Sequence, residues 1–365
     1  MIVSRNQSTH ISIGGKKHLY FGGTNYLGLA HRKEVMKAAT LAFAKYGFSS
    51  GASRLTSGQT DVLIQLEKDL AQFGSCEASV VLPSGYLTNQ AVVDSLDEKI
   101  DFWLMHEKAH ASIKTALSQS QKTIVIYDSK HEKNSLRQRY DLPDDALLGV
   151  FAEPVEPLTG EVIDIDSLSA ACQIDDFLIL DEAHSFGVLG ANGNGAIGCF
   201  DLSLRIKRLI RTGTFSKAFG CYGGFILAQQ ELIDQIKSYA NCYKASTSLP
   251  PVICAAALQA LIMIKEKTTT LEPLRKNIET LNQSFVRLGL KEYQSWSMPI
   301  YHLVDSPVIE DLKSELLDNY IFLPPVGGYF KELGPIGLRF TIQAGHQSND
   351  LERLISIFES YIAVN

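Results

Sequence analysis

The sequence predicts an α/β fold, with a large domain built on a mostly parallel sheet and a smaller α+β domain after it. Short apolar segments typical of buried strands alternate with segments of helical periodicity, which favours a parallel sheet covered by helices. The length of 365 residues is too great for one small core and suits two domains. After Ser248 the pattern changes, because Pro250 and Pro251 interrupt the chain.

The elements of the large domain follow in order. Leu63, Leu66, Leu70 and Phe73 recur at helical spacing and predict a helix over 61–73. Residues 78–82 read as a short strand, then comes a turn at 83–86 and a helix from Leu87. The apolar run 177–180, which ends at an aspartate, predicts a buried parallel strand. Residues 209–210 lead into a glycine-rich segment, and 224–228 form a further strand.

The remaining chain suits the smaller domain. A long helix is expected over 252–265 and a closing helix around 351–362. We therefore predict an N-terminal segment, 1–45, that joins the small domain, a large domain over 46–245 that carries the cofactor site, and a small C-terminal domain over 246–365.

Composition and charge narrow the class of protein. A net charge of −6 argues against a nucleic-acid partner, which would require a basic surface. The six cysteines form no CxxC pair, which favours reduced thiols in a cytoplasm over a disulfide framework. No secretory or membrane-spanning apolar segment is visible. The expectation is a cytoplasmic enzyme without a membrane partner.

The segment LILDEAH, residues 178–184, places an acid where a buried strand ends, the edge at which open α/β sheets bind ligands. The letters DEAH also occur in helicase-type ATPases, but that function needs a GxxxxGK[ST] phosphate loop. The only Gly-Lys pair, Gly15-Lys16, lacks the preceding glycine and is followed by Lys17. The other interpretation pairs Asp181 and His184 with an aromatic ring cofactor; a turn-capping aspartate beside a solvated histidine is the plain alternative.

Lys217 favours the cofactor. It stands alone in the stretch RTGTFSKAFGCYGG, among small and uncharged residues. A desolvated lysine is favoured as a neutral nucleophile that forms a Schiff base with an aldehyde. Thr214 and Ser216 offer hydroxyls for a phosphate, and the glycines permit close approach of a bulky group. Together with Asp181 as a partner for a pyridinium nitrogen, this pattern predicts pyridoxal 5'-phosphate.

A phosphate cup is predicted at Ser84-Gly85-Tyr86, between a strand and a helix start, where backbone N–H groups favour an anion. Tyr86 and His110 are candidates to stack on the ring. Alone, each of these signals is weak, since a strand–glycine–helix turn is common and a histidine in EKAHAS reads equally well as a surface residue.

The chain resembles the α-oxoamine synthases, pyridoxal-phosphate enzymes of aminotransferase fold type I. The resemblance runs along nearly the whole chain, through blocks that are specific only when taken in order: TNYLGLAHR (24–32), GFSSGASRLTSGQT (47–60), LPSGYLTNQAVV (82–93), HAS (110–112), DEAHSFGVLG (181–190), TGTFSKAFG (212–220), STSLPP (246–251) and LRFTIQAGH (338–346). It implies a seven-stranded, mostly parallel sheet and a homodimer with shared active sites.

The resemblance also assigns roles. Lys217 resembles the Schiff-base lysine, Asp181 the partner of the ring nitrogen and His184 the residue that bonds the ring's 3'-oxygen. The other implied positions are the stacking His110, the phosphate-cup residues Gly85, Tyr86 and Thr214, Asn25 near the reacting centre, Arg339 for the amino-acid carboxylate, and Thr247, which would reach the phosphate of the other subunit.

The implied activity is a decarboxylating condensation of an amino acid with an acyl-CoA. The expected subtype is 8-amino-7-oxononanoate synthase, with 2-amino-3-ketobutyrate CoA ligase and a plain class II aminotransferase as alternatives; Lys217 argues against a cofactor-free regulatory subunit. The chain departs from the family pattern where the acyl donor binds. Pro157 replaces the serine of a VFSMDG-like motif, LPPVGG (323–328) replaces RPPTVP, and Gly337 replaces the first arginine of RLRL.

Overall fold

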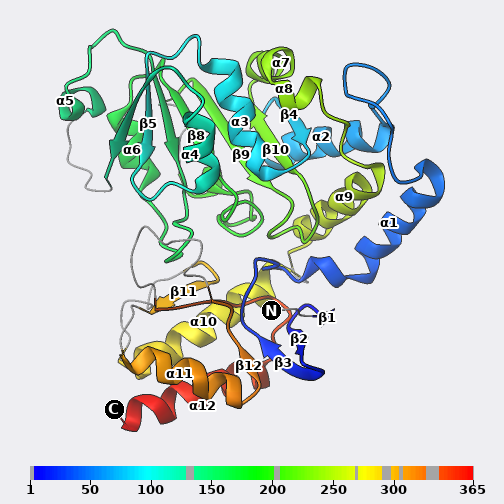
Figure 1. The fold of residues 1–365 in the computed structure, drawn as a ribbon, viewed down its shortest axis with the longest axis vertical. Helices are drawn as coiled ribbons and strands as arrows, with labels where there is room; N and C mark the ends of the chain where they lie inside the picture. Colours follow the sequence, from blue (N-terminus) through cyan, green and yellow to red (C-terminus); the bar gives the residue numbers. More distant parts are fainter. Residues whose placement is uncertain are drawn as a thin grey trace.

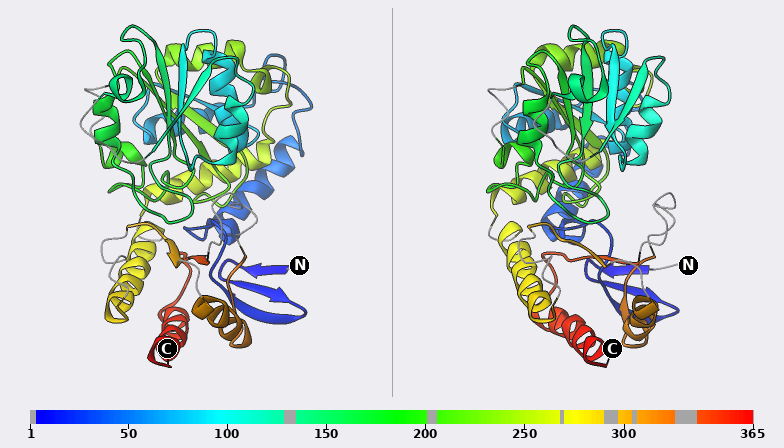
Figure 2. Two further views of the ribbon diagram at one scale, coloured as in Figure 1. Left: turned by 60° about the vertical axis from the view of Figure 1, so that its left-hand side comes forward. Right: turned by 90° about the vertical axis from the view of Figure 1, so that its left-hand side faces the viewer.

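The computed structural model describes residues 4–128, 135–200, 206–267, 270–289, 297–303, 307–325 and 337–364. Figure 1 shows a sheet layered with helices in the upper part of the molecule and a smaller group of helices and short strands below it. The two chain termini both lie in this lower part (Figures 1 and 2). No helix within the described ranges is long and apolar enough to cross a membrane.

The upper part is built on a seven-stranded sheet, which confirms the predicted α/β architecture. The strand order is β4-β10-β9-β8-β7-β5-β6. β10 is antiparallel to both of its neighbours, and the other pairs are parallel. The strands are β4 (Ala78–Leu82), β5 (Phe102–His106), β6 (Thr123–Tyr127), β7 (Leu148–Ala152), β8 (Phe177–Asp181), β9 (Arg208–Thr214) and β10 (Gly224–Ala228).

Alternation along the central strands explains why the sheet is covered on both faces. On β8, Ile179 packs into one buried apolar cluster, whereas Leu178 and Leu180 pack into a different one on the opposite face. Every residue of β8 is buried, as the uninterrupted apolar run predicted. The helices of this part are α2 (Asp61–Phe73), α3 (Gly85–Leu96), α4 (Ala111–Leu117), α5 (Leu136–Tyr140), α6 (Ile165–Ala171), α7 (Gln230–Tyr239) and α8 (Asn241–Lys244).

The lower part joins the two ends of the chain. A four-stranded sheet runs in the order β1-β2-β3-β12, so the N-terminal strands pair with a strand more than 300 residues later in the sequence. Its elements are β1 (Ser4–Gln7), β2 (His10–Ile13), β3 (Lys16–Tyr20) and β12 (Ile321–Phe322), with a separate pair β11 (Ile300–Leu303) and β13 (Leu338–Thr341) and the helices α10 (Leu271–Arg287), α11 (Pro307–Asp318) and α12 (Ser348–Val364).

Two long helices, α1 (Lys33–Tyr46) and α9 (Pro251–Lys265), pack against each other between the two parts (Figure 1). The helix predicted from residue 252 begins at Pro251, because proline is well suited to the first helical position. The helix predicted from Leu87 begins two residues earlier, since the Ser84 side chain caps it by accepting from the N–H of Leu87. Short 3₁₀ turns lie at Leu29–His31 and Ala196–Gly198.

Candidate active site

The carboxyl ends of the parallel strands meet at one edge of the sheet, and the candidate site lies there. Asp181 ends β8, and its side chain is only 8% exposed. Oδ1 accepts a hydrogen bond from the N–H of Ala183 at 3.0 Å, and Oδ2 accepts one from Nδ2 of Asn89 at 2.7 Å. A buried carboxylate that accepts two such bonds is held in place with its charge stabilised.

Lys217 stands on the turn that follows β9, the strand next to β8. Phe215 and Phe219 are fully buried on either side of it, and the N–H of Gly220 closes the turn on the Lys217 carbonyl at 2.9 Å. Gly220 has a φ of +64°, and a Cβ there would lie 2.3 Å from the backbone nitrogen of Ala30. The sequence therefore folds into a tight turn, because only glycine accommodates both constraints.

The surroundings of Lys217 favour a neutral amine. Burial lowers the pKa of Lys217 from its ordinary value to about 8, with a smaller lowering from the Arg339 guanidinium. Asp181 and Glu153 act in the opposite direction but do not compensate for the burial. With a pKa of about 8, roughly a tenth of the amine is unprotonated and nucleophilic at pH 7, far more than for an ordinary lysine.

His184 lies on the turn after β8 and is fixed by a residue that the sequence reasoning passed over. The hydroxyl of Tyr26 lies 2.8 Å from Nδ1 of His184, and both side chains are buried. Burial lowers the pKa of His184 well below its usual range, so the imidazole is neutral, and burial raises the pKa of Tyr26 to about 12. Tyr26 stands inside the quoted block TNYLGLAHR, but nothing in its residue type distinguishes it from a core tyrosine.

His110 caps the N-terminus of α4, where its Nδ1 accepts from the N–H of Ser112 at 3.2 Å. His110 is exposed, and the charges of Asp181 and Lys217 act on its imidazole. The His110 N–H donates to Oε2 of Glu153 at 2.9 Å. Burial lowers the pKa of His110, and burial together with the Asp181 charge raises the pKa of Glu153 to about 8. Both groups are therefore largely uncharged at neutral pH.

The predicted phosphate cup lies at the N-terminus of α3, beside the end of β9. A Cβ built on Gly85 would lie 2.6 Å from Cβ of Thr214, so glycine allows the helix start and the strand end to touch. The Thr214 hydroxyl donates to the carbonyl of Gly223 at 3.0 Å and accepts from the N–H of Ser216. These bonds hold the lysine turn, so donation to a phosphate would require the hydroxyl to leave Gly223. Ser216 is exposed at the turn.

Three further residues predicted for the site differ in their exposure and in their hydrogen-bond partners. Tyr86 is 45% exposed at the start of α3 and donates to Oγ1 of Thr115. Asn25 is 8% exposed, and its amide donates to Oγ of Ser8 at 2.7 Å. Thr247 is exposed and bridges to Ser53, so its side chain is not enclosed by this chain.

Arg339 lies on β13 in the lower part, and its side chain contacts a residue of the upper part. Its Nε and Nη2 donate to the carbonyl oxygen of Pro157 at 3.0 and 2.8 Å. The guanidinium also contributes to lowering the pKa values of Lys217 and His184, which places it at the same site. The proline that replaces the expected serine is thus an acceptor for Arg339 through its backbone. Of the stretch 323–328, residues 326–328 lie outside the described residues.

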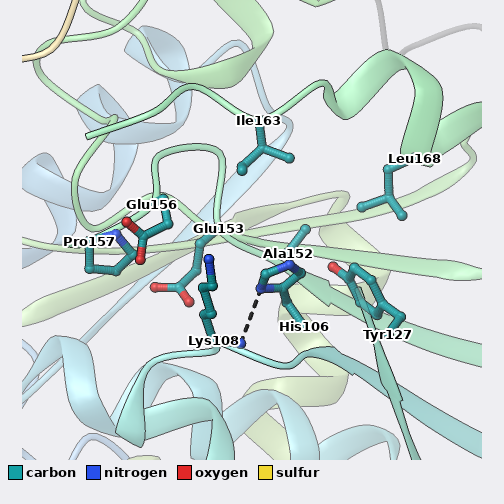
Figure 3. A pocket seen from close by; sticks show the side chains of 9 residues that line it. All are labelled: His106, Lys108, Tyr127, Ala152, Glu153, Glu156, Pro157, Ile163 and Leu168. Carbon is teal, nitrogen blue, oxygen red and sulfur yellow. Dashed lines mark hydrogen bonds between the residues drawn. The ribbon is translucent and has the colours of Figure 1, made fainter. Parts of the chain in front are cut away.

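A pocket borders the site at the carboxyl ends of β5, β6 and β7. Figure 3 shows its lining side chains, among them Lys108, Glu153, Glu156 and Pro157. Its empty space is about 390 Å³, including the part open to solvent. Glu153 and Pro157 belong both to this pocket and to the site just described. The loop after β7, which contains Pro157, therefore contributes to both the pocket and the site. Among the described residues, no cluster of three or more potential ligands has metal-binding geometry.

Known proteins are similar to this chain over nearly its whole length. The family described as aminotransferase class I and II matches residues 16–358. The 8-amino-7-oxononanoate synthase of Thermosipho melanesiensis is 30% identical over 97% of this chain and 90% of its own length. The solved 8-amino-7-oxononanoate synthase of Francisella tularensis is 26% identical with a TM-score of 0.77, and covers 95% of this chain and 98% of its own. Serine palmitoyltransferase of Sphingomonas wittichii shares the fold, with a TM-score of 0.89 at 24% identity, over 99% of this chain and 91% of its own.

Proposed function

The chain belongs to the aminotransferase class I and II family and, within it, to the α-oxoamine synthases, and from this premise we propose that it is a pyridoxal-phosphate-dependent C-acyltransferase with the activity of an 8-amino-7-oxononanoate synthase. The observation that carries the proposal is the convergence of Lys217, Asp181, His184 and Arg339 at one edge of the sheet. Full-length similarity to relatives of that name supports it.

The product in the relatives' name specifies the substrates. In 8-amino-7-oxononanoate the ketone carbon is bonded to the carbon that carries the amine. A condensation that forms this bond requires a seven-carbon acyl thioester with a carboxylate at its far end. The remaining two carbons and the amine are what alanine retains after its carboxyl group leaves as CO2. We propose these two substrate classes for this chain.

The residues present fit pyridoxal 5'-phosphate. The aldehyde requires a neutral amine, and the lowering of the Lys217 pKa to about 8 makes the neutral form accessible close to neutral pH. The ring nitrogen requires an anionic partner, and the Asp181 carboxylate is held by two donors. The phosphate would lie at the N-terminus of α3, near Ser84, Gly85 and Tyr86, where N–H groups of the first turn have no partner within the helix.

When bound, the cofactor supplies an electron sink for the carbanion formed at the amino acid's α-carbon. Lys217 would hold the aldehyde and, as a free amine, would take the α-proton. Because Tyr26 holds His184 through Nδ1, Nε2 of His184 would be available to the ring's 3'-oxygen, and His110 would cover the ring face. Asn25 borders the reacting centre, and Thr214 and Ser216 keep the lysine turn in shape.

Arg339 is proposed to bind the amino acid's carboxylate. Two N–H groups of its planar guanidinium already donate to a single oxygen, the carbonyl oxygen of Pro157. A carboxylate offers the same fork two oxygens and a full charge, so it competes favourably with a neutral carbonyl. Because Arg339 comes from the lower part, occupation of the site would hold the two parts of the molecule together.

We further propose a homodimer with shared active sites. Large apolar side chains are exposed on α1 and on the segment after it, and the rings of Phe43 and Phe48 pack together there with centroids 4.7 Å apart. Thr247 is also exposed, and its bridge to Ser53 brings it close in space to the segment after α1. A second subunit that covers this surface would place Thr247 at its partner's phosphate. Sedimentation analysis of the full-length chain tests the dimer.

The function is tested by thiol release. The purified chain, loaded with pyridoxal 5'-phosphate, is assayed with alanine, glycine or serine against acyl-CoAs of different length, with and without a terminal carboxylate. We expect the highest kcat/KM for alanine with the seven-carbon carboxylate-terminated thioester. A preference for glycine with acetyl-CoA, or for serine with a long acyl chain, would move the protein to another subtype. Absence of thiol release with every pair, together with amino transfer to a keto acid, would make it a plain aminotransferase.

A further inference from the structure

A fully buried amide links two of the proposed cofactor-contacting residues. Asn89 lies on α3, one turn after Gly85, and is 0% exposed. Its Nδ2 donates to Oδ2 of Asp181 at 2.7 Å and to Oγ of Ser112 at 3.0 Å, and its Oδ1 accepts from Oγ1 of Thr212 at 2.9 Å. One side chain thus joins α3 to β8, β9 and α4.

In this hydrogen-bond network, the chemistry of each group decides which atom donates and which accepts. The ionised Asp181 carboxylate only accepts, so the amide nitrogen of Asn89 must face it, and the amide oxygen must face Thr212. Because Oγ of Ser112 accepts the second N–H of the amide, its own hydrogen is directed to Nδ1 of His110, 2.8 Å away. The Ser112 backbone N–H donates to the same nitrogen. The neutral His110 imidazole therefore carries its proton on Nε2.

We propose that Asn89 is a positioning residue that couples Asp181 to His110 through Ser112. It holds the carboxylate toward the ring nitrogen and, at the same time, keeps His110 neutral with an unprotonated Nδ1. The inference rests on the roles proposed above for Asp181 and His110. The hydrogen bonds themselves do not depend on the reaction, so they are open to a test that needs no turnover.

Asn89→Asp tests the direction of the hydrogen bonds in this network. The substitution keeps the shape and the acceptor for Thr212 but removes both N–H donors. The new carboxyl group and Asp181, at hydrogen-bond distance, share one proton between them. No hydrogen remains for Ser112, so the Ser112 hydroxyl turns toward the new carboxyl group and presents a lone pair to His110, which favours a proton on Nδ1. We expect the pKa of His110 to rise by about one unit, and kcat to fall about 10- to 100-fold with a smaller change in KM.

Ser112→Ala separates the hydrogen-bond chain from simple charge attraction. It adds no charge, yet it removes the hydroxyl donor to Nδ1 of the neutral imidazole. The pKa of His110 should therefore rise in this variant too, by less than in Asn89→Asp. The charged and titratable groups that face the imidazole, Asp181, Lys217, Glu153 and His184, are the same in both variants and in the unmodified chain.

The measurement is histidine ¹⁵N NMR against pH on the full-length chain, with and without pyridoxal 5'-phosphate; His110→Gln assigns the signal. Asn282→Asp on α10 and Ser95→Ala on α3 are matched controls, since both residues are buried and hydrogen-bonded elsewhere. They should leave the His110 titration unchanged. An unshifted titration in Ser112→Ala overturns the proposal, even if Asn89→Asp fails to fold. Failure of the thiol-release assay would refute the enzymatic function and leave this result standing.

Discussion

The proposed cofactor side and the proposed substrate side of the site are built differently. On the cofactor side, Asp181 and Lys217 follow adjacent buried strands, and each is fixed by its own turn or by donors from the same sheet. On the other side, Arg339 reaches the site from a separate two-stranded sheet and meets a loop, at Pro157, that departs from the family pattern. The first region is held by hydrogen bonds around one sheet edge and carries the cofactor chemistry in the proposed function. The second is assembled across two parts of the chain, which is where substrate preference can change without loss of the cofactor.

The largest expected effect belongs to the cofactor side. Lys217→Ala should reduce the rate of thiol release by more than about 1,000-fold, because the amine both holds the aldehyde and moves the α-proton. Lys207→Ala, at an exposed lysine before β9, is the matched control. Melting temperature should be similar in both. Full turnover by Lys217→Ala would refute the assignment of the site.

Asp181→Asn should lower kcat by about 100- to 1,000-fold, since a neutral amide does not hold the ring nitrogen protonated. Exchange of the amino acid's α-proton, followed by NMR in D2O, reports this step without the acyl donor. Asp144→Asn, at an exposed aspartate, controls for the loss of one charge. Normal exchange in Asp181→Asn would contradict the role.

On the other side, Arg339→Gln should raise KM for the amino acid about 10- to 100-fold, equivalent to the 1.5–3 kcal/mol of a charged hydrogen bond. The KM for the acyl donor should change less, so the ratio of the two distinguishes binding of the carboxylate from a general loss of structure. Arg353→Gln on α12 is the control. Equal increases in both KM values would show that Arg339 only joins the two parts of the molecule.

The pH dependence of cofactor binding tests an electrostatic interaction between the two regions, because Arg339 lowers the pKa of Lys217. Only the neutral amine attacks the aldehyde, so the rate of reconstitution should rise with pH and level off above the Lys217 pKa of about 8. Arg339 lowers that pKa, so Arg339→Gln should move the midpoint to higher pH. Stopped-flow absorbance of the bound cofactor measures both curves. A midpoint that stays in place in the variant would show that Arg339 exerts no field at Lys217.

The smallest effect is expected from Pro157→Ser, which restores the residue of the family pattern. Arg339 contacts only the backbone carbonyl at this position, and serine supplies the same group. KM for the amino acid should change less than about threefold, and the free energy of unfolding should fall by about 0.4–1 kcal/mol through greater freedom of the unfolded chain. A larger change in KM, measured in the same assay, would mean that the serine hydroxyl acts on substrate in this protein.

The local sequence pattern was sufficient to predict individual helices and strands of this chain. The strand 78–82 and the helix 61–73 were predicted with the bounds that the structure has, because hydrophobic spacing and the flanking turn residues agree there. The site residues Lys217 and Asp181 could be selected because a lone lysine among glycines and an acid at a strand end are unusual in composition. Their roles in the chemistry remain predictions.

Tyr26, Asn89 and Ser112 could not be selected in this way. Each is an ordinary residue for its element, and its importance comes from partners far away in sequence: Tyr26 meets a histidine 158 positions later, and Asn89 an aspartate 92 positions later. The contact of Arg339 with Pro157 spans 182 positions. Such contacts leave no periodic signal, because hydrogen bonds between elements depend on how the sheet orders its strands.

By itself, the sequence determined the family and the cofactor class and predicted the residues able to react with the cofactor, since these depend on side-chain chemistry and local backbone requirements. The tertiary structure decided which of them share a site and in what electrostatic state. The strand order brings β8 beside β9, and the start of α3 lies against Thr214 at the end of β9; Lys217 is partly buried there, and its pKa is lowered. Burial and hydrogen-bond direction are properties of the packed molecule, and only the assembled fold produces them.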